Sequence, residues 1–314
     1  MPPRVLTNVE LETMVDTSDA WITERTGIRE RRIAAPEVAT SDLCADALAE
    51  ACKNASIPID SLDTLIVATS TPDTVFPSTA CWVQKKLGVR GMAAFDVSAG
   101  CTGWLYAMEL AANLIAAGTA KRVGVCGAEV MSKSIDWTDR STCVLFGDGA
   151  GAAVLSATDE NVGFVSSNWG ADGNLAPVLY QPAGGSRRPA SPDTVANREH
   201  SVYMEGNAVF LHAVRSMSTA AMQAMEEAGV GPDEISLLIP HQANMRILEV
   251  TRERTGIHAD KLYSVLYKYG NMSAAMIPVA IHEAYTLGRI HSGDKILLTA
   301  FGTGLTWGAA VLQW

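Results

Sequence analysis

The stretch SAGCTGWLYAMELAANLIAAG, residues 98–118, places a cysteine at the start of a long apolar helix. A free cysteine in such a position is most often a small, buried hydrophobic side chain. A helix N-terminus also carries unpaired N–H groups and a partial positive charge, which favour the thiolate over the thiol. Whether Cys101 is a packing residue or a nucleophile therefore depends on what the rest of the chain brings to it.

The C-terminal half contains a second stretch with the same organisation, YGNMSAAMIPVAIHEAYTLG, residues 269–288. In each half a buried strand precedes the helix and another buried strand follows it. Cys101 follows Leu65 of the preceding strand by 36 positions, and Asn271 follows Leu237 by 34. The four strands are expected at 61–73, 120–130, 233–244 and 293–304. The chain is therefore predicted to contain two copies of one α/β unit.

Two copies of an α/β unit predict both the fold class and the position of a site. We expect mixed, mostly parallel sheets covered by helices, with an N-terminal half at 1–160 and a C-terminal half at 161–314. Ligands of such folds bind at the carboxyl ends of the strands. A pseudo-twofold axis would bring these ends together, with Cys101 and Asn271 at matching positions at the heads of buried helices. His241, at the end of the strand ISLLIP, would lie beside them.

The repeat also indicates a missing element. The C-terminal half begins with a strand, 161–170, before its first helix, whereas no strand precedes the corresponding helix at 41–55. We therefore predict that the chain starts late and lacks one N-terminal strand.

Composition argues against several classes of function. The chain has 314 residues, 48% of them hydrophobic, and a formal net charge of −10, which argues against nucleic-acid binding. It has no signal-peptide core and no apolar stretch long enough to span a membrane, so a cytoplasmic location is expected. The six cysteines form no CxxC pair and lie near no histidine at a metal-ligand spacing, so we expect no metal. The GDGAGA segment at 147–152 leads into a strand, which argues against a dinucleotide loop.

Together, Cys101, His241 and Asn271 suit the chemistry of thioesters. A thiolate attacks a thioester carbonyl and becomes acylated, and the oxyanion formed needs N–H donors. The backbone N–H groups of Cys101 and of the turn at Thr303 are candidates. Neutral histidine and asparagine both donate hydrogen bonds without being strong bases. They suit an enolate produced by decarboxylation, which predicts a Claisen condensation of a malonyl thioester with loss of carbon dioxide.

Six motifs carry a resemblance to a known family. They are VDTSDAWITERTGIRERRI, FDVSAGCTGW, TDRSTCVLFGDGAGAAVL, PHQANMRI, YGNMSAA and FGTGLTWGAAV. From about residue 3 to the C-terminus the chain resembles β-ketoacyl-[acyl-carrier-protein] synthase III, the condensing enzyme that starts type II fatty acid synthesis. The resemblance implies a thiolase-like fold with two five-stranded-type sheets in αβαβα layers, a homodimer and no cofactor. It also implies that an acyl-CoA primer and malonyl-acyl carrier protein are condensed through Cys101, His241 and Asn271.

The resemblance assigns further binding residues. Those implied to bind coenzyme A are Thr17, Trp21, Arg25, Arg140, Asn207 and Asn244. Phe76 matches the residue that reaches into the acyl pocket of the partner subunit. Arg246 matches a residue that docks acyl carrier protein, and the run at 245–256 adds Arg252 and Arg254 as candidates. Leu211 and Glu253 replace basic residues used by some members, and residues 302–304 read Gly-Thr-Gly where many members have three glycines.

Other functions remain to be weighed. A degradative thiolase needs a second cysteine near the C-terminal glycine loop, but no cysteine follows Cys143. A hydroxymethylglutaryl-type synthase would need a glutamate in the loop 69–76, which has none. A starter-unit condensing or acyl-transfer enzyme of polyketide or signal-molecule synthesis would keep all three residues and stays open. A binding protein with a vestigial site also stays open.

Overall fold

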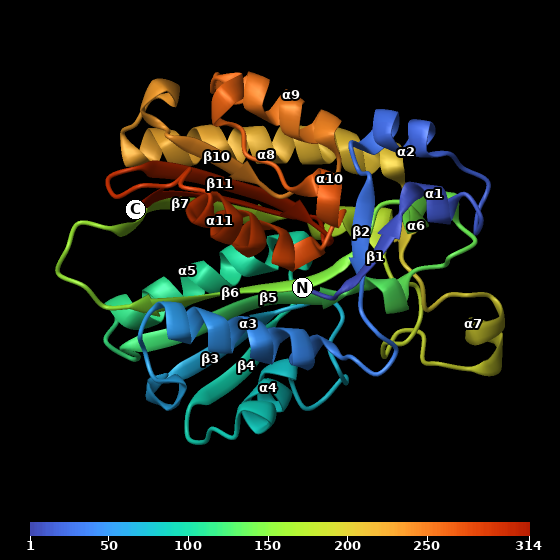
Figure 1. Cartoon of the computed structure of the whole chain (residues 1–314), viewed down its shortest axis with the longest axis horizontal. Helices are drawn as coiled ribbons and strands as arrows, with labels where there is room; N and C mark the ends of the chain where they lie inside the picture. Colours follow the sequence, from blue (N-terminus) through green and yellow to red (C-terminus); the bar gives the residue numbers. More distant parts are fainter.

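Two mixed β-sheets lie face to face across a pair of buried helices, and further helices cover their outer faces (Figure 1). This arrangement comes from a computed structural model that describes residues 1–314. The layers run from α8 and α9 through the second sheet, the helices α11 and α5, and the first sheet to α3 and α4 (Figure 1). The expected αβαβα layering is therefore present.

The two sheets share a three-strand core, β3-β5-β6 in the first and β10-β11-β12 in the second, and carry their fourth strand on opposite edges. The first sheet has the order β4-β3-β5-β6, and the second has the order β10-β11-β12-β7. In the first, β3 pairs in parallel with β4 and β5, and β5 pairs antiparallel with β6. The bounds are β3 Thr64–Ala68, β4 Ala93–Val97, β5 Arg122–Val130, β6 Asp148–Ser156, β7 Gly163–Ala171, β10 Leu237–Pro240, β11 Lys295–Gly302 and β12 Thr306–Gln313.

The helices occupy three layers and the connections between them. The layer helices are α3 Thr40–Asn54, α4 Thr79–Leu87, α5 Gly103–Ala116, α8 Gly206–Ala228, α9 Met245–Thr255 and α11 Met276–Thr286. The short elements of the N-terminal and connecting segments are β1 Arg4–Thr7, α1 Asn8–Leu11, α2 Asp19–Thr26, β2 Glu30–Ile33, α6 Arg140–Cys143, β8 Leu179–Tyr180, α7 Pro192–Ala196, β9 Tyr203–Met204 and α10 Leu266–Tyr269. None of the helices is long and apolar enough to span a bilayer.

The largest part of the hydrophobic core lies between the sheets. It joins the central helices to both sheets through side chains such as Trp104 of α5, Met276 of α11, Ile66 of β3 and Leu298 of β11. Because α5 and α11 are covered on both sides, they are apolar around most of their circumference, as expected of buried helices. This explains why the two stretches that define the repeat are so rich in alanine, leucine and methionine.

The strand count differs from the expectation of five-stranded sheets, since each sheet has four strands. In the second sheet the edge position beside β10, which β4 fills in the first sheet, holds only one parallel bridge, between Leu238 and Leu262. In the first sheet no strand lies on the outer edge of β6, where β7 pairs with its counterpart β12. The first segment of the chain instead pairs β1 with β2, outside both sheets.

The match between Cys101 and Asn271 is wrong by three residues. A 3₁₀ turn leads into each central helix, Gly100–Thr102 before α5 and Ser273–Ala275 before α11. Aligning these turns makes Ala274 the counterpart of Cys101, and Ser273 the counterpart of Gly100. The first residues of the two turns share a positive φ, +56° at Gly100 and +46° at Ser273. The repeat therefore brings Cys101 and Asn271 to the same region without making them equivalent.

Candidate active site

Cys101 lies in the 3₁₀ turn that leads into α5, and only 9% of its surface is exposed. Burial raises the pKa of its thiol to about 12, although the nearby Ser273 side chain lowers it and the negative charge of Glu129 raises it further. The thiol is therefore protonated at neutral pH in the free protein. A nucleophilic role requires that its proton leave during the reaction.

The loop between β11 and β12 is held tightly against the Cys101 turn. The Thr306 hydroxyl donates to the carbonyl oxygen of Ala99 at 2.9 Å and to the Thr102 hydroxyl at 3.1 Å. A Cβ on Gly302 would lie 2.7 Å from the backbone nitrogen of Cys101, and one on Gly100 would lie 2.7 Å from that of Thr303. Glycine at both positions lets the two backbones approach. The two predicted oxyanion donors, at Cys101 and Thr303, are thus in neighbouring segments.

His241 follows the last residue of β10, and its backbone N–H donates to the carbonyl oxygen of Thr299 on β11 at 2.7 Å. The ring is buried, and its Nδ1 has no hydrogen-bond partner. Burial lowers the pKa of His241 to about 3, so the imidazole is neutral at physiological pH. A neutral imidazole carries one N–H donor and one acceptor nitrogen, as the sequence reasoning required.

The residues after His241 fix its surroundings. The Gln242 side chain donates to the carbonyl oxygen of Tyr263 at 3.2 Å and accepts from the backbone N–H of Val265 at 2.8 Å. Asn244 caps α9 by accepting from the backbone N–H of Arg246 at 2.9 Å. The sequence His-Gln-Ala-Asn therefore combines a pocket residue, an anchor and a helix cap.

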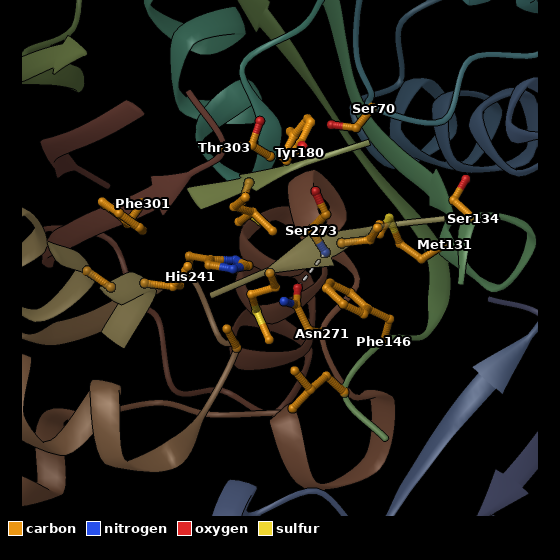
Figure 2. Close-up of a pocket in the computed structure, with 18 of the residues that line it drawn as sticks. Ser70, Met131, Ser134, Phe146, Tyr180, His241, Asn271, Ser273, Phe301 and Thr303 are labelled. Carbon is orange, nitrogen blue, oxygen red and sulfur yellow. Dashed lines mark hydrogen bonds between the residues drawn. The ribbon is translucent and has the colours of Figure 1, made fainter. Parts of the chain in front are cut away.

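Asn271 is held by its backbone and by one end of its amide. Its backbone N–H donates to the carbonyl oxygen of Leu145 at 2.8 Å, and its carbonyl oxygen accepts from Gly147 at 3.0 Å. Its Oδ1 accepts from the backbone N–H of Ser273 at 2.8 Å, which leaves Nδ2 as the free end of the amide. Figure 2 shows the His241 ring and the Asn271 amide facing the same space.

A cavity of about 280 Å³ joins the predicted catalytic residues. Cys101, His241, Asn271 and Thr303 all contribute to its wall. Most of the remaining wall is hydrophobic, with Met131, Phe146 and Phe301 among the labelled side chains in Figure 2. The arrangement has the usual character of a small-molecule site, an apolar cavity with a few convergent polar groups.

The residues expected to bind coenzyme A form two groups. Trp21 of α2 lies close to two arginines, since the guanidinium carbon of Arg140 is 5.1 Å from its ring centroid and that of Arg25 is 5.9 Å away. Thr17 precedes α2 in the sequence, and its hydroxyl is buried and has no hydrogen-bond partner. Asn244 donates to the carbonyl oxygen of Arg25 at 2.9 Å, which connects α9 to α2. Asn207 is exposed in the first turn of α8.

The remaining predicted residues lie outside the cavity. Phe76 is 83% exposed and does not line the cavity of its own chain. Arg246 is exposed, with its guanidinium carbon 5.6 Å from the centroid of the Phe210 ring, and Arg254 is also exposed. The Arg252 side chain is only 15% exposed and is bound to Glu249, Glu253 and the carbonyl oxygen of Ile257. Arg252 therefore has a structural role that the charge pattern alone did not reveal.

Sequence reasoning missed two residues that contact the site. Glu129, on the fully buried end of β5, is 0% exposed, and Ser273 lines the cavity beside Asn271. The Ser273 hydroxyl donates to Glu129 Oε1 at 2.9 Å. A signal for Glu129 was present, because a glutamate inside the otherwise apolar strand RVGVCGAEV is unusual unless its carboxylate is satisfied.

Comparisons with known proteins identify the family of this chain. Residues 95–173 match the family model 3-Oxoacyl-[acyl-carrier-protein (ACP)] synthase III, and residues 225–314 match the model of its C-terminal part. A β-ketoacyl-[acyl-carrier-protein] synthase III of Caldanaerobacter subterraneus is 52% identical over 100% of this chain and 95% of its own. The crystal structure of 3-oxoacyl-[acyl-carrier-protein] synthase III from Aquifex aeolicus has a TM-score of 0.92 and 46% identity, covering 100% and 97% of the two chains. The priming β-ketosynthase of the R1128 polyketide pathway has a TM-score of 0.91 and 32% identity, covering 99% and 93%.

The fold and the relatives define a thiolase-fold condensing enzyme, an acyltransferase of fatty acid biosynthesis. Within that class, the chain belongs to the 3-oxoacyl-[acyl-carrier-protein] synthase III family, the type that performs the initiating condensation.

Proposed function

We propose that this chain condenses an acyl-CoA primer with malonyl-acyl carrier protein to give 3-ketoacyl-acyl carrier protein, CoA and carbon dioxide. The observation that carries the proposal is the single cavity lined by Cys101, by His241 in its neutral form and by Asn271. A thiol, a neutral imidazole and an amide are the groups that an acyl-enzyme route with a decarboxylative second step requires.

In the first half-reaction the Cys101 sulfur attacks the carbonyl carbon of the primer thioester. The C–S bond to coenzyme A then breaks, and CoA leaves as a thiol with the proton that Cys101 gives up. The oxyanion formed in between accepts hydrogen bonds from the backbone N–H groups of Cys101 and Thr303. The close approach of these segments, which Gly302 and Gly100 allow, supports this role.

In the second half-reaction the malonyl carboxylate leaves as carbon dioxide, and its bonding electrons form an enolate. The enolate oxygen accepts hydrogen bonds from the His241 ring and from Asn271 Nδ2. The enolate carbon attacks the acyl group on Cys101, the C–S bond breaks, and the Cys101 thiolate takes up a proton. A neutral His241 stabilises the enolate without quenching it by protonation, which is why its lowered pKa supports the route.

Coenzyme A binds with its adenine against Trp21 and Arg140, with Thr17 and Arg25 at the nucleotide end and with Asn207 and Asn244 along the pantetheine arm. The grouping of Arg25 and Arg140 around Trp21 supports the nucleotide end, because an aromatic ring and two cations suit an adenine and its phosphates. No cofactor and no metal takes part in this scheme.

The acidic carrier protein docks on α9 through Arg246 and Arg254, which are both exposed. A local basic surface is needed because the net charge of the chain, −10, repels an acidic partner as a whole. Arg252 does not belong to this surface, since its guanidinium is bound within its own chain.

The active form is a homodimer in which Phe76 enters the acyl pocket of the partner subunit. Phe76 and the neighbouring Val75 are 83% and 85% exposed, and Phe95 on the edge strand β4 is 37% exposed. Exposed apolar side chains, one of them on the edge strand β4, support burial against a second copy. The enzyme works in the cytoplasm, and its two halves, 1–160 and 161–314, each supply part of the site.

A starter-unit enzyme of polyketide or signal-molecule synthesis is the second candidate function. The similarity to a priming polyketide ketosynthase, at 32% identity, is the observation that favours it. Both candidates share the acyl-enzyme step and differ in the carrier protein that accepts the acyl group.

The test measures both half-reactions. Incubation with acetyl-CoA, or with a longer or branched primer, should add one acyl group to the intact mass of the wild type and of Cys126→Ala, but not of Cys101→Ala. Cys126 is the matched control because it is a buried cysteine outside the cavity. Wild-type protein should then release carbon dioxide from malonyl-acyl carrier protein, and His241→Ala and Asn271→Ala should not. An acyl group on Cys101→Ala, or none on the wild type with any primer, would contradict the proposal.

A further inference from the structure

Glu129 carries a buried carboxylate that the proposed steps do not use. Its two oxygens accept from the hydroxyls of Thr69, Thr71 and Ser273 and from the backbone N–H of Ser70. The contact with Thr71 is 2.7 Å and that with Ser273 is 2.9 Å. No arginine, lysine or histidine forms an ion pair with it. A buried carboxylate held only by neutral donors is costly, so its presence next to the cavity calls for a function.

Ser273 connects this carboxylate to the site. Its hydroxyl donates to Glu129, and its backbone N–H donates to Asn271 Oδ1 at 2.8 Å, a contact drawn as a dashed line in Figure 2. The hydrogen bond to Oδ1 decides which end of the Asn271 amide is free. With the oxygen bound inside the turn, the Nδ2 donor remains for the cavity.

The backbone conformation of Ser273 indicates that its side chain is needed. Its φ is +46°, a value that residues other than glycine rarely adopt. The corresponding turn of the first half has glycine at this place, Gly100 with φ +56°. A serine in this conformation carries strain, which a useful contact of its side chain can offset. The hydroxyl contact with Glu129 is that contribution.

We propose that Glu129 is a positioning residue that acts through the Ser273 hydroxyl, holding the turn 271–273 so that the Asn271 amide N–H points into the cavity. The inference rests on the proposed function, in which Asn271 stabilises the enolate. A carboxylate suits the task better than an amide, because donors from four residues converge on its two oxygens. A glutamine would turn an NH₂ group toward some of those donors and leave them unpaired.

The test compares the two half-reactions in Glu129→Gln, Ser273→Ala and Ser273→Gly. Decarboxylation of malonyl-acyl carrier protein should fall by about tenfold to a hundredfold in all three, because a displaced amide no longer meets the enolate oxygen. Acylation of Cys101 by acetyl-CoA should fall less than decarboxylation in all three variants, since the oxyanion donors are untouched. In Glu129→Gln it should not fall at all, because the Glu129 charge raises the pKa of the Cys101 thiol and its loss favours the thiolate. Ser273→Gly is the decisive variant, because it relieves the positive φ and removes only the side chain.

Matched controls separate positioning from stability. Ser218→Ala removes a buried hydroxyl bound to the carbonyl oxygen of Val214, and Asp148→Asn neutralises a second buried carboxylate, bound to Ala34 and Ser132. Both lie outside the cavity, so folded protein should keep the wild-type ratio of the two half-reactions. Decarboxylation within about twofold of the wild type in Ser273→Gly, or an equal fall of both half-reactions in all three variants, would overturn the inference. If the wild type itself releases no carbon dioxide, the proposed function fails instead.

Discussion

Acid should destabilise this protein in part through one histidine. The pKa of His241 falls from an ordinary value of 6.5 to about 3 because the ring is buried. The unfolded chain therefore binds a proton at a pH where the folded chain does not, and stability is lost as the pH falls below 6.5. At about 1.4 kcal/mol per pKa unit, the full difference is about 5 kcal/mol, of which about 2 to 3 kcal/mol is expressed between pH 7 and pH 4.5.

The assay is urea unfolding of the wild type and of His241→Gln at both pH values. Glutamine is polar and neutral at every pH, so the variant keeps the carboxylates that titrate in this range and loses only the histidine. The free energy of unfolding of the wild type should fall by about 2 to 3 kcal/mol more than that of the variant between pH 7 and pH 4.5. Parallel losses in the two proteins would refute the assignment of a buried, neutral His241 and, with it, the enolate-stabilising role.

Three further predictions concern the same site. Gly302→Ala should reduce Cys101 acylation by about a hundredfold, because the new Cβ would lie 2.7 Å from the Cys101 nitrogen; Gly173→Ala, with no atom within 4 Å of its new Cβ, should acylate normally. The rate of Cys101 alkylation by iodoacetamide should rise about tenfold per pH unit from pH 7 to pH 9, since the thiol pKa is about 12; a plateau in that range would mean that the pKa is much lower. Arg140→Ala should weaken acetyl-CoA binding by about tenfold in a titration without changing the acylation rate at saturation; unchanged affinity would exclude Arg140 from the nucleotide site.

The layered fold could be predicted from the sequence because both halves repeat the same order of buried strands and buried helices. Leu65–Val67 and Leu237–Ile239 are apolar runs that only a strand covered on both faces explains. The register of the repeat was harder to predict. The number of positions from the preceding strand aligned Asn271 with Cys101, whereas the positive φ values align Ser273 with Gly100. A positive φ is hard to predict from sequence when the residue is serine instead of glycine.

The parts of the site that escaped prediction depend on contacts between distant segments. Glu129 and Ser273 are 144 positions apart, and neither belongs to a short motif that suggests the other. The sequence alone could not distinguish Arg252 from Arg246 and Arg254. The direction of the Arg252 side chain depends on Glu249 and on the carbonyl oxygen of Ile257, just beyond the end of α9. Phe76 is 83% exposed within one chain, so the acyl-pocket role proposed for it depends on the proposed second subunit.

The exposed segment that follows β6 also bears on how the enzyme is assembled. Residues 157–162 join β6 to β7, are exposed throughout and contribute nothing to the cavity. Cys101 comes from one side of this connection, and His241 and Asn271 come from the other, while the side chains of α5 and α11 interlock between the sheets. The connection at 157–162 thus mainly ensures that the N-terminal and C-terminal halves are present in a one-to-one ratio. Two separately expressed fragments, one ending and one beginning in this segment, should associate and restore a cysteine that acetyl-CoA acylates. In this respect the single chain resembles a heterodimer whose two subunits are covalently joined.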